Sequence, residues 1–312
     1  MSNDFSPRSP LTTPVLFLIY KRPETTERVF NAIRMAKPQK LFIAADGPKK
    51  DSADEAETCQ QVRKIATAVD WECEVKTLFR NENLGCRRAV SNAINWFFEN
   101  VDEGIILEDD CLPSLSFFGF CEELLKRYKN DTRIMHIAGY NAHFGKRYGD
   151  ASYYFSNYNL IWGWATWRRA WQYYSEDMSD YEYFLKSKTF KDVFHSKKEQ
   201  LFFKDSFKQT FQGHIDSWGY FWLFSRCMQG GYSIHPNSNL IENIGFTENA
   251  THTKSTNGKL GKNPKTEIIF PLTHPRFTLP DRNADHNIFT TLHCNNYWSY
   301  RINKLIKRFI GC

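Results

Sequence analysis

Strand-like runs of apolar residues alternate with helix-like stretches through the first half of the chain, and this alternation constrains the fold most. Apolar runs fall at residues 14–20, 40–45, 104–107 and 134–138, and residues 73–79 are predicted as a further strand, with lengths typical of strands. The stretches between them carry helical spacing, and Pro23 suits a first helical turn. Five alternations within about 140 residues favour an α/β fold, with a mostly parallel twisted sheet and helices on both faces.

Polar side chains follow four of these strands at the point where each strand ends. They are Lys21-Arg22, Asp46-Gly47, residues 81–85, and the triplet Glu108-Asp109-Asp110. Ligands of open parallel sheets bind beyond the carboxyl ends of the strands. The sequence therefore predicts that these four clusters meet in one crevice.

The acidic triplet stands directly behind the buried strand at residues 104–107. Neighbouring carboxylates repel one another unless a cation lies among them. A divalent metal with oxygen ligands, in the company of a diphosphate, is the natural partner. The alternative is an acidic turn that caps the helix after Pro113, but a cap needs one carboxylate rather than three.

Composition excludes some classes of protein. The net charge is +6, from 41 basic and 35 acidic residues, and no dense basic stripe with interleaved aromatic residues occurs, so nucleic-acid binding is not expected. None of the eight cysteines forms a Cys-x-x-Cys pair. The first ten residues do not read as a signal peptide and no run of eighteen apolar residues occurs. These features predict a cytoplasmic protein with reduced thiols.

The second half is rich in aromatic residues, especially over residues 160–171. Trp162 and Trp164 are predicted to stack on sugar rings of an acceptor, although aromatic residues this dense also occur as plain core. Residues 232–235 resemble an edge strand.

Asp216 is the predicted catalytic base, because Ile215 and Trp218 flank it and partial desolvation would make it a stronger base. The alternative role is an N-cap for the helix that follows. Asp205, which also has aromatic neighbours, is the rival base.

The chain divides into a disordered lead-in at 1–13, a domain at 14–250, and a mobile loop with a basic C-terminal extension at 251–312. Within the domain, residues 14–138 form the nucleotide-binding half and 139–250 the acceptor half. Residues 296–310 read as a basic amphipathic helix, which is predicted either to lie on an anionic membrane surface or to pack on the body of the protein. His252, in the loop, is either a solvated residue or part of the metal site.

Several motifs occur in an order that resembles a known family. These are residues 17–23, Ala45-Asp46-Gly47, Asn83-Leu84-Gly85, Leu107–Asp110, Gly163-Trp164 and Asp216-Ser217-Trp218. In this order they resemble nucleotide-diphospho-sugar glycosyltransferases of the GT-A fold, and within them bacterial relatives of N-acetylglucosaminyltransferase I. The resemblance covers roughly residues 14–250, and its ordered set is more specific than the acidic triplet alone.

The resemblance implies a role for each matching residue. Asp110 would bind Mn²⁺ or Mg²⁺, while Glu108 and Asp109 would hold the ribose and the sugar. Arg22 would contact the nucleotide or its phosphates, and Asp46 the uracil ring. By their position in the resemblance, Asn83 and Arg88 would lie near the base or the diphosphate.

The sequence thus predicts a metal-dependent, inverting glycosyltransferase that uses a UDP-sugar such as UDP-N-acetylglucosamine. The acceptor would be a glycan or lipid-linked glycan of a bacterial surface polysaccharide, reached at the inner face of the cytoplasmic membrane. Two alternatives remain. A nucleotidyltransferase that makes the activated sugar would carry a Gly-rich first turn, which residues 21–23 lack. A non-catalytic carbohydrate-binding protein would not need the acidic triplet.

Overall fold

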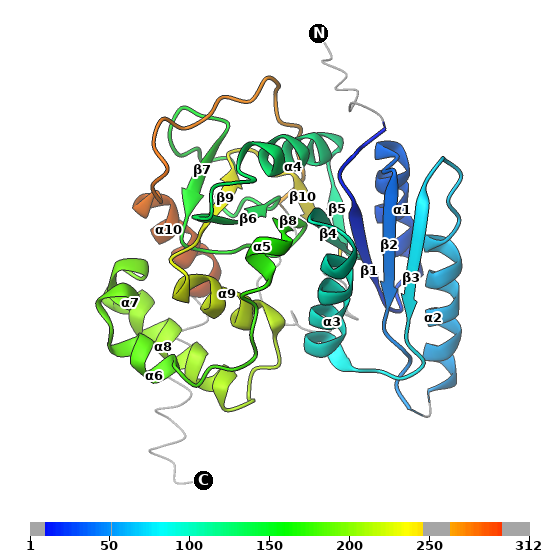
Figure 1. Cartoon of the computed structure of the whole chain (residues 1–312), viewed down its shortest axis with the longest axis horizontal. Helices are drawn as coiled ribbons and strands as arrows, with labels where there is room; N and C mark the ends of the chain where they lie inside the picture. The colour runs from blue at the N-terminus through cyan, green and yellow to red at the C-terminus, as the bar shows by residue number, and fades with distance from the viewer. Residues whose placement is uncertain (1–9, 51, 246–262, 295–312) are drawn as a thin grey trace.

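The computed structural model describes residues 10–50, 52–245 and 263–294 (Figure 1). Its first half alternates strand and helix as the sequence predicts. The elements are β1 (Val15–Ile19), α1 (Pro23–Ala36), β2 (Lys40–Ala45), α2 (Ala53–Ala66), β3 (Glu74–Phe79), α3 (Gly85–Asn100), β4 (Glu103–Glu108), β5 (Cys111–Pro113), α4 (Leu115–Arg127) and β6 (Ile134–Ala138). The short strand β5 was not foreseen.

The second half adds strands to the same sheet and a helical lobe beside it (Figure 1). Its elements are β7 (Tyr153–Ser156), β8 (Trp164–Trp167), α5 (Arg168–Trp171), α6 (Tyr181–Lys186), α7 (Lys188–Val193), α8 (Lys197–Phe211), α9 (Trp218–Met228), β9 (Tyr232–Pro236), β10 (Ile241–Asn243), α10 (Arg282–Phe289) and a π-helical turn (Thr290–Cys294). Within the aromatic segment at residues 160–171, residues 164–167 form β8 and residues 168–171 form α5.

The main sheet has eight strands in the order β3-β2-β1-β4-β8-β6-β9-β7. Pairing is parallel from β3 to β4 and between β6 and β9, and antiparallel on both sides of β8 and between β9 and β7. This is the mostly parallel α/β sheet that the sequence predicts. The edge-strand prediction for residues 232–235 was wrong, because β9 is paired on both sides by β6 and β7.

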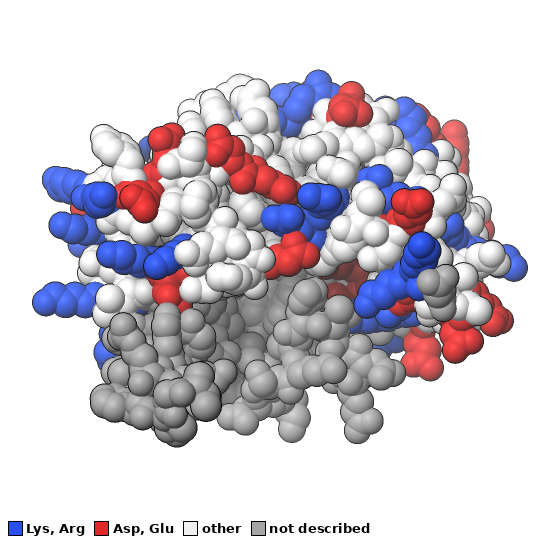
Figure 2. Space-filling view, turned by 90° about the horizontal axis from the view of Figure 1, so that it is seen from below, with Lys and Arg blue, Asp and Glu red and all other residues white. Residues whose placement is uncertain are grey.

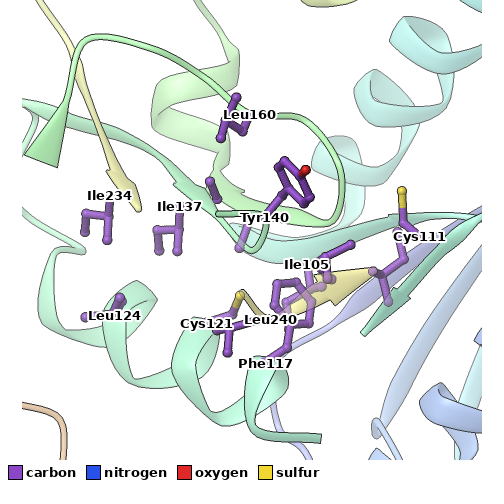
Figure 3. Close-up of a cluster of buried hydrophobic side chains, with 14 of the residues drawn as sticks. Ile105, Cys111, Phe117, Cys121, Leu124, Ile137, Tyr140, Leu160, Ile234 and Leu240 are labelled. Atoms are coloured by element: carbon purple, nitrogen blue, oxygen red, sulfur yellow. The ribbon is translucent and has the colours of Figure 1, made fainter. Parts of the chain in front are cut away.

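Helices cover both faces of the sheet, and the alternation of side chains along β1 divides the core between them. Val15, Phe17 and Ile19 join the cluster formed with α1 and α4, while Leu16 and Leu18 join the cluster formed with α3 and α9. Figure 3 shows the first cluster, where the residues of α4 that face the sheet lie below Ile105 and Ile137. Because helices cover both faces of the sheet, a ligand can reach it only at the ends of its strands.

Two chain segments outside the expected domain pack on it. Leu11 is buried, and its backbone bonds the end of α1 through Ala36, so residues 10–13 belong to the packed structure. Asp285 of α10 accepts hydrogen bonds from the Ser156 hydroxyl and from the amide groups of Asn157. Residues 263–294 thus attach to both halves of the domain, since Glu267 also accepts the backbone amides of Leu115 and Ser116 at the start of α4.

Other predictions lie outside the described residues, namely those for 1–9, His252 and the helix at 296–310. None of the described helices is long and apolar enough to cross a membrane. The six cysteines whose side chains are described are free thiols: Cys59, Cys73, Cys86, Cys111, Cys121 and Cys227.

Buried histidines should make the fold sensitive to acid. His235 is fully buried and donates from Nε2 to the carbonyl of Tyr158 at 2.9 Å. Burial lowers the pKa of His235 to about 3. In the unfolded chain His235 has an ordinary pKa of about 6.5, so at lower pH the unfolded chain binds a proton there and the folded chain does not. The stability of the fold therefore decreases as the pH falls below about 6.5. Asp285 acts in the opposite direction, because burial raises its pKa to about 7.

A comparison of variants isolates the histidine contribution. His235→Gln keeps a donor near the Nε2 position but cannot be protonated. We expect wild type to be the more stable protein at pH 7, and to lose about 2 kcal/mol relative to the variant by pH 5. Urea unfolding at both pH values measures this, with His214→Gln, at an exposed histidine, as the control. A constant difference between wild type and His235→Gln would contradict the prediction.

Candidate functional site

A cavity of about 560 Å³ lies beyond the carboxyl ends of β1, β2, β3 and β4. Its polar lining residues are Tyr20, Lys21, Arg22, Asp46, Lys49, Arg80, Asn83, Cys86, Glu108, Asp109, Asp110, Trp162, Asp216, Ser217 and Asn243. The four polar clusters that follow the strands therefore do meet at one site. The cavity also has apolar walls from Leu18, Ala44 and Val90, and its volume falls within the range for small-molecule sites.

Asp46 joins two of the loops that form the cavity. Its carboxylate accepts hydrogen bonds from the backbone amides of Gly47, Leu84 and Gly85 at 2.9–3.2 Å. The last two amides belong to the start of α3, where backbone N–H groups have no partner within the helix. Burial raises the pKa of Asp46, and these three bonds oppose that rise. Asp46 thus holds the loop after β2 against α3 as well as lining the cavity.

Asn83 and Tyr20 stabilise the same part of the cavity wall, between the loop after β2 and the start of α3. The Asn83 amide donates to the Tyr20 hydroxyl and to the Gly47 carbonyl, both at 2.9 Å. Lys21 pairs with Glu55, whose carboxylate also accepts the Lys49 amide at 2.7 Å. The loops after β1, β2 and β3 are therefore tied together before any ligand binds.

The acidic triplet shares one arginine. The Arg22 guanidinium lies 2.7 Å from Asp110 Oδ2 and 3.8 Å from Asp109 Oδ1. Asp109 also accepts the Tyr20 amide at 3.0 Å. Burial, followed by the repulsion of the neighbouring carboxylates, raises the pKa of Glu108 to about 8 and that of Asp109 to about 7, while Arg22 opposes both shifts. One guanidinium therefore balances the triplet only in part, and further positive charge would be favourable here.

The donor set fits a divalent cation that is shared with a ligand. Within residues 10–50, 52–245 and 263–294, no group of three or more His, Cys, Asp or Glu side chains has an arrangement that alone would hold a metal. Mg²⁺ sites commonly use one or two carboxylates, with substrate phosphates and water completing the shell. Asp110, with Glu108 and Asp109 beside it, provides that carboxylate oxygen chemistry at the cavity wall.

Gly245 packs directly against Asp110, and this contact gives a prediction. A Cβ atom at Gly245 would lie 2.4 Å from Asp110 Oδ2 and 2.8 Å from its Cβ atom. Gly245→Ala should displace the carboxylate while leaving the charges unchanged. The Mn²⁺-dependent UDP binding that the sequence predicts should weaken at least tenfold in this variant, because small misplacements at such sites have large effects. Calorimetry measures this, with an unchanged melting temperature as the control; unchanged affinity would contradict it.

The loops after β2 and β3 bring further cations to the cavity. Lys49 and Arg80 join Lys21 and Arg22 in its lining. The Arg80 charge also opposes the rise that burial causes in the pKa of Asp46. Sequence reasoning missed Lys49 and Arg80, although their position just after two parallel strands was a usable signal. These cations suit a ligand that carries several negative charges.

Asp216 faces the cavity from the segment before α9, in a setting that differs from the prediction. Its side chain is 61% exposed, and the Arg87 guanidinium lies 2.9 Å from its carboxylate. The expected desolvation was therefore wrong. The cap alternative was also wrong, because Ser217 occupies the N-cap position of α9.

Arg87 was not predicted, and the structure makes it the nearest cation to Asp216. Its guanidinium also lies over the Phe221 ring at 5.6 Å and 3.8 Å from Glu176. These contacts hold Arg87 of α3 against α9, so a positive charge lies 2.9 Å from the Asp216 carboxylate. The residue predicted from the sequence was Arg88 instead. Arg88 is one helical step away, is exposed and does not line the cavity.

The two tryptophans predicted to contact the acceptor lie in different surroundings. Trp162 lines the cavity and packs edge-on against Tyr140 at 4.6 Å between ring centroids. Trp164 is fully buried in β8, stacked between His136 and Trp218. The acceptor role predicted for Trp164 was wrong, because a buried ring has no surface to offer. Asp205, the rival base, lies on α8 and does not line the cavity.

Comparison with known proteins leaves the function to be argued from the site. No protein-family model matches the chain, and no curated protein matches it. Similar solved structures include HddC from Yersinia pseudotuberculosis, 12% identical over 40% of this chain and 57% of that chain, with a TM-score of 0.28. Another is UDP-glucose pyrophosphorylase complexed with UDP-glucose, 10% identical over 48% of this chain and 64% of that chain, also at 0.28. This chain thus covers less than two thirds of either structure, and similarity this low carries no argument.

Proposed function

We propose that the protein is a metal-dependent glycosyltransferase that transfers a sugar from a UDP-sugar, such as UDP-N-acetylglucosamine, to a hydroxyl group of a glycan. One observation carries the proposal: Arg22 and the triplet Glu108–Asp110 share a cavity with further cations and with a separate, exposed carboxylate, Asp216. The triplet suits a divalent cation, and Arg22 with the other cations suits a diphosphate. Asp216 would receive a proton from the acceptor.

The residues divide the work of the transfer. Asp110 would hold Mn²⁺ or Mg²⁺, with Glu108 and Asp109 beside it, and the ion would supply charge neutralisation for the leaving diphosphate. Arg22 binds a phosphate oxygen, and Asp46 and Asn83 hold the corner of the cavity where the nucleotide lies. These contacts orient the donor before reaction.

Asp216 acts on the acceptor. It takes the proton from the acceptor hydroxyl as that oxygen attacks the anomeric carbon, and the carbon–oxygen bond to the diphosphate breaks with its electron pair going to the diphosphate. A single displacement of this kind inverts the anomeric configuration. Arg87, at 2.9 Å, keeps the Asp216 carboxylate in place.

The proposal extends to the acceptor and its location. The acceptor is a surface polysaccharide precursor, either a free glycan or one linked to lipid, and the enzyme works in the cytoplasm at the inner face of the membrane. The basic segment at residues 296–310 is the predicted membrane contact from the sequence. Trp162, at the cavity wall, is the residue proposed to stack on the acceptor sugar.

Product analysis tests the proposal. Wild-type protein is incubated with UDP-N-acetylglucosamine and other UDP-sugars, with Mn²⁺ and without it. A glycosyltransferase releases UDP, through transfer or slow hydrolysis, and only with the metal. In a parallel incubation with added pyrophosphate, formation of UTP and sugar 1-phosphate would instead identify a nucleotidyltransferase. Binding without any turnover would favour a carbohydrate-binding protein.

A further inference from the structure

The helical lobe formed by α6, α7 and α8 has a rigid inner side. Phe184 of α6 and Phe207 of α8 both lie edge-on against Phe224 of α9, at 5.6 and 5.5 Å between ring centroids. Phe190 of α7 packs on Phe184 at 5.5 Å. These aromatic contacts fix which side chains the three helices turn outward.

The outward side of this lobe carries many lysines. The exposed ones are Lys186, Lys188, Lys191, Lys197, Lys198, Lys204 and Lys208. The exposed acids on the same three helices are Glu182 and Asp192 alone, and residues 181–211 contain no arginine. Figure 2 shows Lys and Arg side chains gathered at its left edge, the side on which α6, α7 and α8 lie in Figure 1. The outer face is therefore strongly cationic.

Apolar side chains stand among the lysines on α8. Lys197, Leu201, Lys204, Lys208 and Phe211 follow one another at spacings of four, three, four and three residues, which places them on one face of the helix. Leu201 is 47% exposed and Phe211 is 50% exposed. We call these five residues the α8 stripe.

We infer that the α8 stripe binds the surface of an anionic lipid bilayer. Lysine heads reach anionic headgroups while the leucine and phenylalanine enter the interface between headgroups and acyl chains, as on amphipathic helices that lie on membranes. Leu201 and Phe211 favour a bilayer over a purely polar anionic surface, because a bilayer offers an apolar layer that exposed apolar side chains can enter. The five residues of the α8 stripe are separate from the basic segment at residues 296–310.

Vesicle sedimentation tests the inference with the full chain. Wild-type protein should bind vesicles that contain phosphatidylglycerol and not vesicles of phosphatidylcholine alone, and binding should fall as salt rises. Lys204→Glu with Lys208→Glu should lower the partition coefficient at least tenfold, since each basic residue near the surface contributes roughly fivefold. Leu201→Gln should lower it as well.

Lysines elsewhere give a matched control. Lys64→Glu with Lys126→Glu, on the exposed sides of α2 and α4, makes the same change in net charge and should leave binding within twofold of wild type. Each variant must melt at the wild-type temperature. Equal losses in the two charge-reversed pairs would overturn the inference, as would wild type that does not bind acidic vesicles. Binding to an acidic polysaccharide but not to vesicles would overturn it in favour of an anionic glycan.

Discussion

Asp110→Asn is expected to abolish the contribution of Mn²⁺ to UDP binding. The substitution keeps the shape of the side chain but removes the charge that lies 2.7 Å from Arg22 at the cavity wall. Loss of one partner from a desolvated charge cluster commonly costs several kcal/mol, so affinity for UDP in the presence of Mn²⁺ should fall roughly 100-fold. Isothermal titration calorimetry, with and without the metal, measures the change.

Asp102→Asn is the control for this variant. Asp102 precedes β4, at the opposite end from the acidic triplet, and its side chain is 77% exposed. The control should bind UDP and Mn²⁺ like wild type. If Asp110→Asn kept the full Mn²⁺ effect, Asp110 would not be the metal ligand, and the role proposed for the triplet would have to be withdrawn.

Asp216→Asn is expected to stop transfer without weakening donor binding. The carboxylate is 61% exposed at the open side of the cavity and is separate from the acidic triplet. Loss of a general base typically slows a reaction by about 10²–10⁴-fold. The measurements are the rate of UDP release with an acceptor present and the affinity for UDP by calorimetry.

Glu176→Gln serves as the control for Asp216→Asn, because Glu176 is the other carboxylate near Arg87, at 3.8 Å, and does not line the cavity. Its transfer rate should stay close to that of wild type. Persistence of transfer in Asp216→Asn would place the base elsewhere. A matching loss of UDP affinity would show instead that Asp216 helps to bind the donor.

The first half of the fold was predictable because its signals are local. Except for β3, which is mixed in polarity, the parallel strands there are short apolar runs. The helices carry their own spacing and turn residues, as Pro23 does at the start of α1. The position of ligand-facing residues followed from topology, since parallel strands end at one edge. Arg22, Asp46 and Asp110 therefore line one cavity although they are far apart in the sequence.

The second half was not predictable in the same way, because long-range pairing decides it. β8 enters between β4 and β6 as an antiparallel strand, and this places Trp164 in the core. Whether Arg87 or Arg88 faces the site depends on the rotation of α3 about its axis. The sequence does not define where the helix begins to within one residue, so it does not define this rotation. The exposure of Asp216 likewise depends on how α9 packs, and its aromatic neighbours in sequence point into the core instead.

The central claim is that the cavity beyond β1–β4 binds a nucleoside diphosphate together with a divalent cation. Calorimetric titration of the wild-type protein with UDP, with Mn²⁺ and in the presence of a chelator, tests it most directly. We predict one site per chain and an affinity at least tenfold higher with Mn²⁺ than with the chelator. Failure of UDP to bind under either condition would contradict the claim.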